Sequence, residues 1–215
     1  WVREQRPALY RKMKFKSLNR TNSQTPAPRP RGEQQAFSEI EDDMEGLIPM
    51  QRLIQGDVGS GKTAVAALAL AKIVENGYQG ALMAPTEVLA GQHYRTFQEF
   101  YKGLPIHVAY LSGQTKTKER NEILKGLKDG SIDVLIGTHA LIEEDVVFAH
   151  LGLVITDEQH RFGVKQRKAL ETKGGYPHIL VMTATPIPRT IALAIFGVLD
   201  MSAIRGRPPG RPPVK

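Results

Sequence analysis

Short apolar runs alternate with longer segments of helical period along most of the chain. The runs are continuously apolar, which is typical of parallel strands buried on both faces. We expect strands at 51–55, 80–85, 106–111, 133–138, 151–157 and 178–185. We expect helices between them at 34–45, 62–77, 86–101, 117–130 and 164–172. This alternation predicts a three-layer α/β/α domain around a mostly parallel sheet.

The two ends of the chain differ from its body. Residues 1–31 carry nine Lys and Arg against one acid, and residues 205–215 carry four against none, although the whole chain totals only +7. Both ends are rich in proline and lack periodicity, so we expect a basic disordered segment at 1–31 and a basic linker at 205–215. Such ends either attract nucleic acid or are merely solvated. The folded unit is therefore expected at 32–204.

Composition excludes several classes of protein. The 215 residues contain no cysteine, which rules out disulfides and thiolate metal sites. The longest apolar run, 64–71, is far too short to span a membrane. With no targeting signal visible, we expect a cytoplasmic protein without a membrane partner. Because the chain begins at Trp1 rather than Met, we expect a segment of a longer protein.

The stretch GDVGSGKT follows the first expected strand and opens a helix. It fits the phosphate-binding loop G-x-x-x-x-G-K-[ST], in which glycines let the backbone approach phosphates and the amide groups face the anion. Lys62 would reach the terminal phosphates, and the Thr63 hydroxyl would bind Mg²⁺. The residues expected to hold the nucleotide here are Gly56, Asp57, Val58, Gly59, Ser60, Gly61, Lys62 and Thr63.

Two carboxylates close the buried run LVITDE. Alone they could be a solvated turn, but a phosphate loop needs such groups at the end of an adjacent strand. We expect Asp157 to hold Mg²⁺ and Glu158 to act as the general base toward water. Together with Lys62 they are the candidate catalytic residues.

Five motifs occur in an order that resembles a known family. They are GDVGSGKT, APTEVLAGQH, GTHALI, DEQHRFGVKQR and TATPIPRT. Over about residues 32–213 the chain resembles the first RecA-like motor lobe of superfamily-two helicases and, among these, the RecG-type branched-DNA helicases. The translocase lobe of transcription-repair coupling factors is similar, but it usually has Asp-Glu-Glu-His where this chain has DEQH. The resemblance implies ATP and Mg²⁺ as cofactors.

The resemblance also implies a track for DNA along the ends of the strands. Its residues would be Thr86, Glu87, Gly113, Thr138 and His139. The N-terminus of a helix favours binding of a phosphate. Contacts to phosphates carry no information on the base sequence, so binding to DNA would be sequence-independent. For any one of these residues the alternative is a plain helix cap.

Further roles follow from the family likeness alone. Thr183 and Thr185 of TATP would link the nucleotide state to the grip on DNA, and His160 could join that relay. Gln34 resembles the adenine-reading glutamine of the superfamily. Pro30 and Arg31 stand where the family commonly has Leu-Thr, which departs from its pattern.

The family likeness implies partners outside this sequence. In RecG-type helicases a second motor lobe and a wedge domain of the same protein act with the first lobe on stalled forks and Holliday junctions. We expect this lobe alone to be nearly inactive. A non-catalytic nucleotide- or DNA-binding lobe is the remaining alternative.

Overall fold

The computed structural model describes residues 31–157, 164–197 and 200–204. The segments expected to be disordered or linking, 1–31 and 205–215, lie outside this description, except that Arg31 opens the first described helix. Glu158 and His160 also lie outside it.

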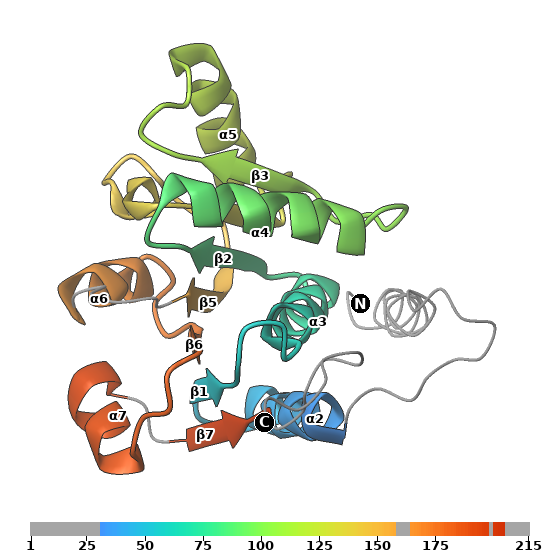
Figure 1. Ribbon diagram of the computed structural model, residues 1–215. Helices are drawn as coiled ribbons and strands as arrows, with labels where there is room; N and C mark the ends of the chain where they lie inside the picture. Colours follow the sequence, from blue (N-terminus) through green and yellow to red (C-terminus); the bar gives the residue numbers. More distant parts are fainter. Residues whose placement is uncertain (1–30, 158–163, 198–199, 205–215) are drawn as a thin grey trace.

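The core of the molecule is one seven-stranded sheet in the order β3-β4-β2-β5-β6-β1-β7. All of its strand pairs are parallel. The strands are β1 (Gln51–Gln55), β2 (Gln79–Met83), β3 (Val108–Leu111), β4 (Val134–Gly137), β5 (Leu151–Asp157), β6 (His178–Thr183) and β7 (Asp200–Ala203). The expected strands are thus confirmed in kind. Because every pair is parallel, their carboxyl ends lie along one edge of the sheet, which twists from β3 to β7 (Figure 1).

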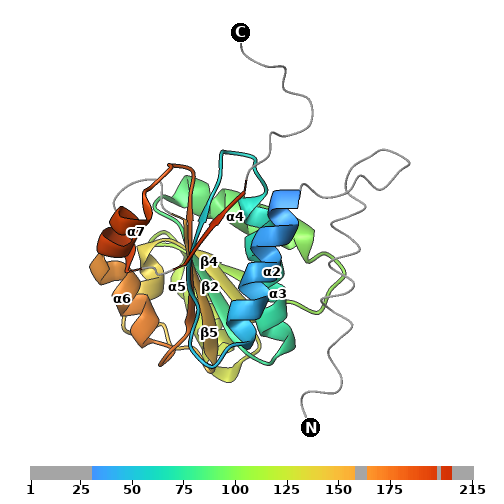
Figure 2. The same ribbon diagram turned by 90° about the horizontal axis from the view of Figure 1, so that it is seen from below.

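Helices cover both faces of the sheet. They are α2 (Arg31–Glu45), α3 (Lys62–Glu75), α4 (Glu87–Phe100), α5 (Thr117–Asp129), α6 (Val164–Thr172) and α7 (Arg189–Phe196), with a short 3₁₀ helix η1 (His139–Ile142). Helices α2, α3 and α4 lie on one side and α5, α6 and α7 on the other (Figure 2). The predicted three-layer α/β/α architecture is therefore confirmed.

Alternation within each strand divides the core into two parts. Leu82 of β2 packs with the α3 side, whereas its neighbours Ala81 and Met83 pack with the α5 side. Helix α3 is buried along most of its length because it lies between the sheet and two other helices. A side chain at Gly80 would meet Leu70 of this helix at 2.1 Å, so glycine lets α3 approach β2 closely.

Three elements were not predicted, one of which is the 3₁₀ helix η1 that follows β4. Helix α7 follows TATP, and the edge strand β7 pairs with β1 over only four residues. The stretch DMSA carries little strand signal of its own. It is held from outside, because the Arg52 guanidinium donates a hydrogen bond to the Ser202 hydroxyl at 2.8 Å.

No helix in the described part of the chain is both long and apolar enough to cross a membrane.

Candidate functional site

The phosphate loop lies between β1 and α3 at the carboxyl edge of the sheet. Gly59 and Gly61 adopt φ angles of 81° and 93°, which residues with a Cβ atom rarely adopt. The Ser60 amide donates to the Asp57 carbonyl at 3.0 Å and closes the turn. The sequence thus folds locally as the loop motif requires, with Gly61 directly preceding the first residue of α3.

Lys62 points back over this loop. Its ammonium group donates to the carbonyl of Asp57 at 2.8 Å and also to that of Gly56. Burial lowers the pKa of Lys62, while the charges of Asp157 and Asp57 act in the opposite direction. A bound phosphate would supply the negative charge that a half-buried ammonium favours.

Asp157 ends β5, but β5 is not adjacent to β1. Strand β6 lies between them, so the expectation of an adjacent strand was wrong. Parallel strands are joined by helical crossovers, so strands that are consecutive in the sequence need not be neighbours in the sheet. The apolar runs carry no information on the order of the strands in the sheet. Asp157 pairs with Met182 of β6, and the next residue of β6, Thr183, pairs with Gln55 at the end of β1. The register therefore brings Asp157 to the same edge of the sheet as the phosphate loop.

The carboxylate of Asp157 has a partner that the sequence did not reveal. His93 of α4 lies with its Nε2 at 2.5 Å from Asp157 Oδ2. Both side chains are mostly buried, with 11% and 15% of their surface exposed. Because His93 occupies an apolar stripe of α4, its spacing indicates a packed residue; only its place in the APTEVLAGQH motif hinted at more.

The TATP segment contacts the phosphate loop through its main chain. The Gly56 amide donates to the Thr183 carbonyl at 3.1 Å, and the Thr183 hydroxyl accepts a hydrogen bond from the Thr185 amide at 3.1 Å. Gln55 accepts one from the Ile187 amide at 3.3 Å. The expected coupling residues Thr183 and Thr185 therefore lie beside the loop, whereas His160 is outside the described residues.

The residues expected to contact DNA follow three neighbouring strands, β2, β3 and β4. The Thr86 hydroxyl accepts a hydrogen bond from the Leu89 amide at 3.2 Å, which is the cap considered as an alternative. Gly113 and His139 are exposed. The Thr138 hydroxyl oxygen is buried and has no hydrogen-bond partner among the described residues. The structure thus places these residues at one edge of the sheet. For Thr86 it also shows the helix cap that was the alternative to a contact with DNA.

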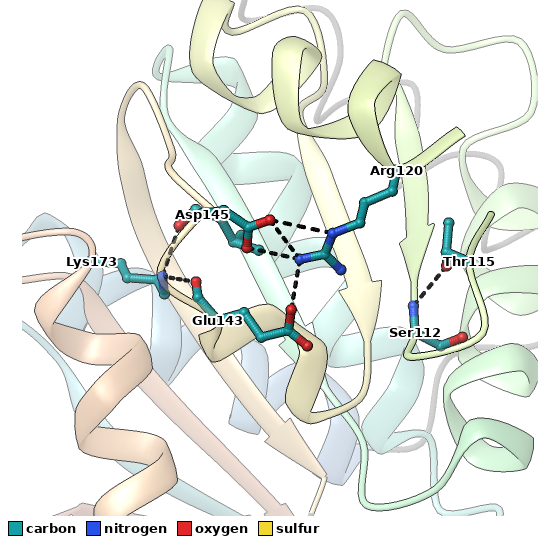
Figure 3. Close-up of polar contacts among 7 residues, drawn as sticks. Ser112, Thr115, Arg120, Glu143, Asp145 and Lys173 are labelled. Carbon is teal, nitrogen blue, oxygen red and sulfur yellow. Dashed lines mark hydrogen bonds and ion pairs between the residues drawn. The ribbon is translucent and has the colours of Figure 1, made fainter. Parts of the chain in front are cut away.

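Ion pairs brace the loop that follows His139 (Figure 3). Arg120 of α5 bonds Glu143 at 2.7 Å and Asp145 at 2.8 Å. Lys173 donates to the main-chain carbonyls of Glu143 at 2.6 Å and Val146 at 2.8 Å. These contacts hold η1 and its loop against the helices on that face.

Gln34 lies exposed near the start of α2. A hollow of about 420 Å³ between this helix and β7 is lined by its neighbour Gln35, together with Gly32, Ala36, Glu39, Met201, Ser202 and Ala203. Gln34 itself is not among the residues that line the hollow.

The donors present suit a nucleotide that carries its own metal ion. The Ser60 hydroxyl is buried and has no partner within the described part of the protein. Among the described residues, no three His, Asp or Glu side chains gather to hold a metal unaided. Mg²⁺ is commonly bound by one or two carboxylates plus substrate phosphates. Asp157 would supply a carboxylate to such an ion, and Thr63 would supply a hydroxyl.

The all-parallel sheet and this loop together define a RecA-like P-loop domain. The sequence profile of DEAD/DEAH box helicases matches residues 32–194. The chain therefore belongs to the DEAD/DEAH box helicase family.

Individual relatives agree with the resemblance to RecG-type helicases, which is confirmed. The chain is 52% identical to the ATP-dependent DNA helicase RecG of Aquifex aeolicus over 198 residues, covering 91% of this chain and 25% of the relative. It is 51% identical to that of Thermotoga maritima over 213 residues, covering 99% and 27%. The chain thus spans about a quarter of the length of these curated relatives.

Solved structures give the same picture. A structure of RecG bound to a three-way DNA junction superposes with a TM-score of 0.80 at 48% identity, covering 96% of this chain and 27% of that one. The helicase MrfA bound to DNA superposes at 0.67 with 16% identity, covering 89% and 29%, which supports the fold alone.

Proposed function

We propose that residues 32–204 form the ATP-binding motor lobe of an ATP-dependent DNA helicase that remodels branched DNA in recombination and repair. The observation that carries this proposal is a complete phosphate loop, with Lys62 donating back to its carbonyls, at the same edge of the sheet as Asp157. The names of the RecG relatives support the same activity for the whole protein. They do not favour a transcription-repair translocase or a non-catalytic lobe. As its location we propose the cytoplasm, where a protein that processes DNA in this way would meet its substrate.

Each residue of the loop has a defined task in this proposal. The amides of Gly59 to Thr63 and the Lys62 ammonium would hold the phosphates of ATP. Thr63 and Asp157 would hold Mg²⁺, which when bound neutralises the charge that develops on the phosphates. Glu158 would take a proton from the attacking water. Gln34 would read the adenine.

The carboxyl ends of β2, β4 and β3 would hold one DNA strand. These strands are neighbours in the sheet. The residues that follow them would therefore form one line, made of Thr86, Glu87, Thr138, His139 and Gly113. Contacts to successive phosphates would bind DNA without reading its sequence. Binding through phosphates weakens as salt rises, which gives this part of the proposal a direct readout.

The rest of the full-length protein would complete the motor. A second motor lobe would supply arginines toward the transferring phosphoryl group, and a wedge domain would grip the junction. Arginine fingers contribute roughly 10³–10⁵ in rate, so we propose that this lobe alone turns over ATP very slowly.

The test is ATP turnover by the full-length protein with and without a three-way DNA junction. The unmodified protein should be stimulated by DNA, and Lys62→Ala and Asp157→Asn should each abolish turnover. Lys128→Ala, an equal charge change at an exposed site on α5, should keep it. Turnover that survives both site variants would refute the proposal.

A further inference from the structure

His93 directly links two neighbouring parts of the proposed site. It belongs to α4, whose first residues lie at the edge proposed to hold DNA. Its imidazole lies against Asp157, the proposed metal carboxylate, at 2.5 Å. Residues 93 and 157 are 64 positions apart in the chain, so only the fold brings them together.

The sheet sets the position of this contact. Strands β2 and β5 are neighbours, and Met83 pairs with Thr156, so Asp157 lies just beyond the end of β2. Helix α4 starts there and crosses the sheet face with Ala90, His93 and Phe97 buried against it. Seven residues separate Thr86 from His93, about 10 Å along the helix axis.

Two contacts orient the imidazole. Its ring meets the Phe97 ring edge-on, with centroids 6.3 Å apart and planes at 76°. An ionised carboxylate only accepts hydrogen bonds, so the ring N–H donates to Asp157. Such a donor fixes the direction in which the carboxylate presents its other lone pairs.

We propose that His93 is a positioning residue that couples DNA binding at the start of α4 to nucleotide binding at Asp157. The inference rests on the proposed function and adds to it a specific element of regulation. A helix moves as a unit, so a shift of its first turn on contact with a DNA phosphate also shifts His93 and the carboxylate it holds. Coupling of this kind is reciprocal: nucleotide at Asp157 changes the affinity of the α4 edge for DNA by the same factor.

Three substitutions at position 93 separate the effect of the hydrogen bond from that of packing. His93→Leu fills the space but removes the donor, and His93→Asn is polar but too short to reach Asp157. His93→Gln keeps a donor at about the same reach. Gln98→Leu, on the exposed side of the same helix, is the matched control.

The experiment measures the dissociation constant of a non-hydrolysable fluorescent ATP analogue with Mg²⁺, in the full-length protein, with and without a three-way junction. In the unmodified protein DNA should change this constant about 5- to 150-fold, the usual range of allosteric coupling. The factor should fall toward one in the Leu and Asn variants and return with Gln, while Gln98→Leu should keep it.

The outcomes separate this inference from the proposed function. Normal nucleotide binding with a coupling factor that does not depend on residue 93, or a Gln variant that behaves like Leu, would overturn the inference alone. Failure of the unmodified protein to bind the analogue would overturn the proposed function and the inference with it. A misfolded variant would lose nucleotide affinity in the absence of DNA as well, so retention of that affinity, together with thermal unfolding of each variant, separates lost coupling from misfolding.

Discussion

The amide of Gly56 donates a hydrogen bond to the carbonyl of Thr183 at 3.1 Å. The first residue of the phosphate loop is thereby fixed to the last residue of β6. The contact uses only main-chain atoms, so it does not depend on the threonine side chain. The Thr183 hydroxyl instead accepts from the Thr185 amide at 3.1 Å and shapes the TATP turn.

Because the carbonyl and the hydroxyl of Thr183 make different hydrogen bonds, Thr183→Val should impair DNA-stimulated turnover and leave nucleotide binding nearly unchanged. The substitution keeps the branched shape and the carbonyl but removes the hydroxyl, at a loss of about 1 kcal/mol of stability. Nucleotide affinity should stay within about twofold, a free-energy change of under 1 kcal/mol. DNA-stimulated turnover of the full-length protein should fall, because the turn loses its internal bond. Nucleotide affinity reduced as far as in Lys62→Ala would contradict this.

Gly137→Ala tests the close approach of two strands beneath the proposed DNA edge. A Cβ there would lie 1.8 Å from the carbonyl oxygen of Leu111 and 2.5 Å from Leu141. Backbone atoms cannot yield cheaply, so we expect the free energy of unfolding to fall by roughly 2–4 kcal/mol. Urea unfolding of this chain measures it.

A second glycine gives the control for that measurement. Gly91 lies in α4, and a Cβ there would meet nothing within 4 Å. Alanine favours helix over glycine by about 1 kcal/mol, so Gly91→Ala should leave stability unchanged or raise it. Equal losses at Gly137 and Gly91 would show that the contact with Leu111 is not the cause.

The raised pKa of Glu75 leads us to expect that the stability of the protein depends on pH. Burial raises its pKa to about 7 from 4.5, against a weaker opposite effect of Lys72. Between these values the folded state binds more protons than the unfolded one, so stability falls as pH rises through that window. Glu75→Gln should therefore stabilise the protein by roughly 1 kcal/mol at pH 8, after allowance for solvent screening. The gain should vanish below pH 4.5.

Urea unfolding at pH 4 and pH 8 measures this difference. Glu122→Gln, the same charge change at an exposed position on α5, is the control for this measurement. If Glu75→Gln changed the free energy of unfolding equally at pH 4 and pH 8, ionisation of this carboxyl would not destabilise the folded state, which would contradict the prediction.

Local patterns predicted much of this fold. The run 151–157 was expected as a strand and is β5 with the same bounds, because an apolar run bounded by polar residues marks a buried strand unaided. The loop at Gly56–Thr63 was equally readable, since its chemistry is local. Strand β7 was missed because its four residues are held by β1 and Arg52 rather than by their own propensity.

Relations between distant residues were not readable. Nothing in the sequence says that β6 separates β5 from β1, because each crossover helix is compatible with several strand orders. The bond of His93 to Asp157 depends on that order and on the register of β2 against β5. A histidine on an apolar stripe looks the same whether it packs or holds a carboxylate.

Titration of this chain with Mg-ATP, followed by fluorescence, tests the central claim most directly. Saturable binding is predicted, with Lys62→Ala reducing affinity by about 100-fold or more, equivalent to roughly 2.7 kcal/mol. Lys128→Ala removes the same charge from an exposed site on α5 and should bind like the unmodified chain. Binding that is equal in all three proteins would contradict the assignment of the phosphate loop as the nucleotide site.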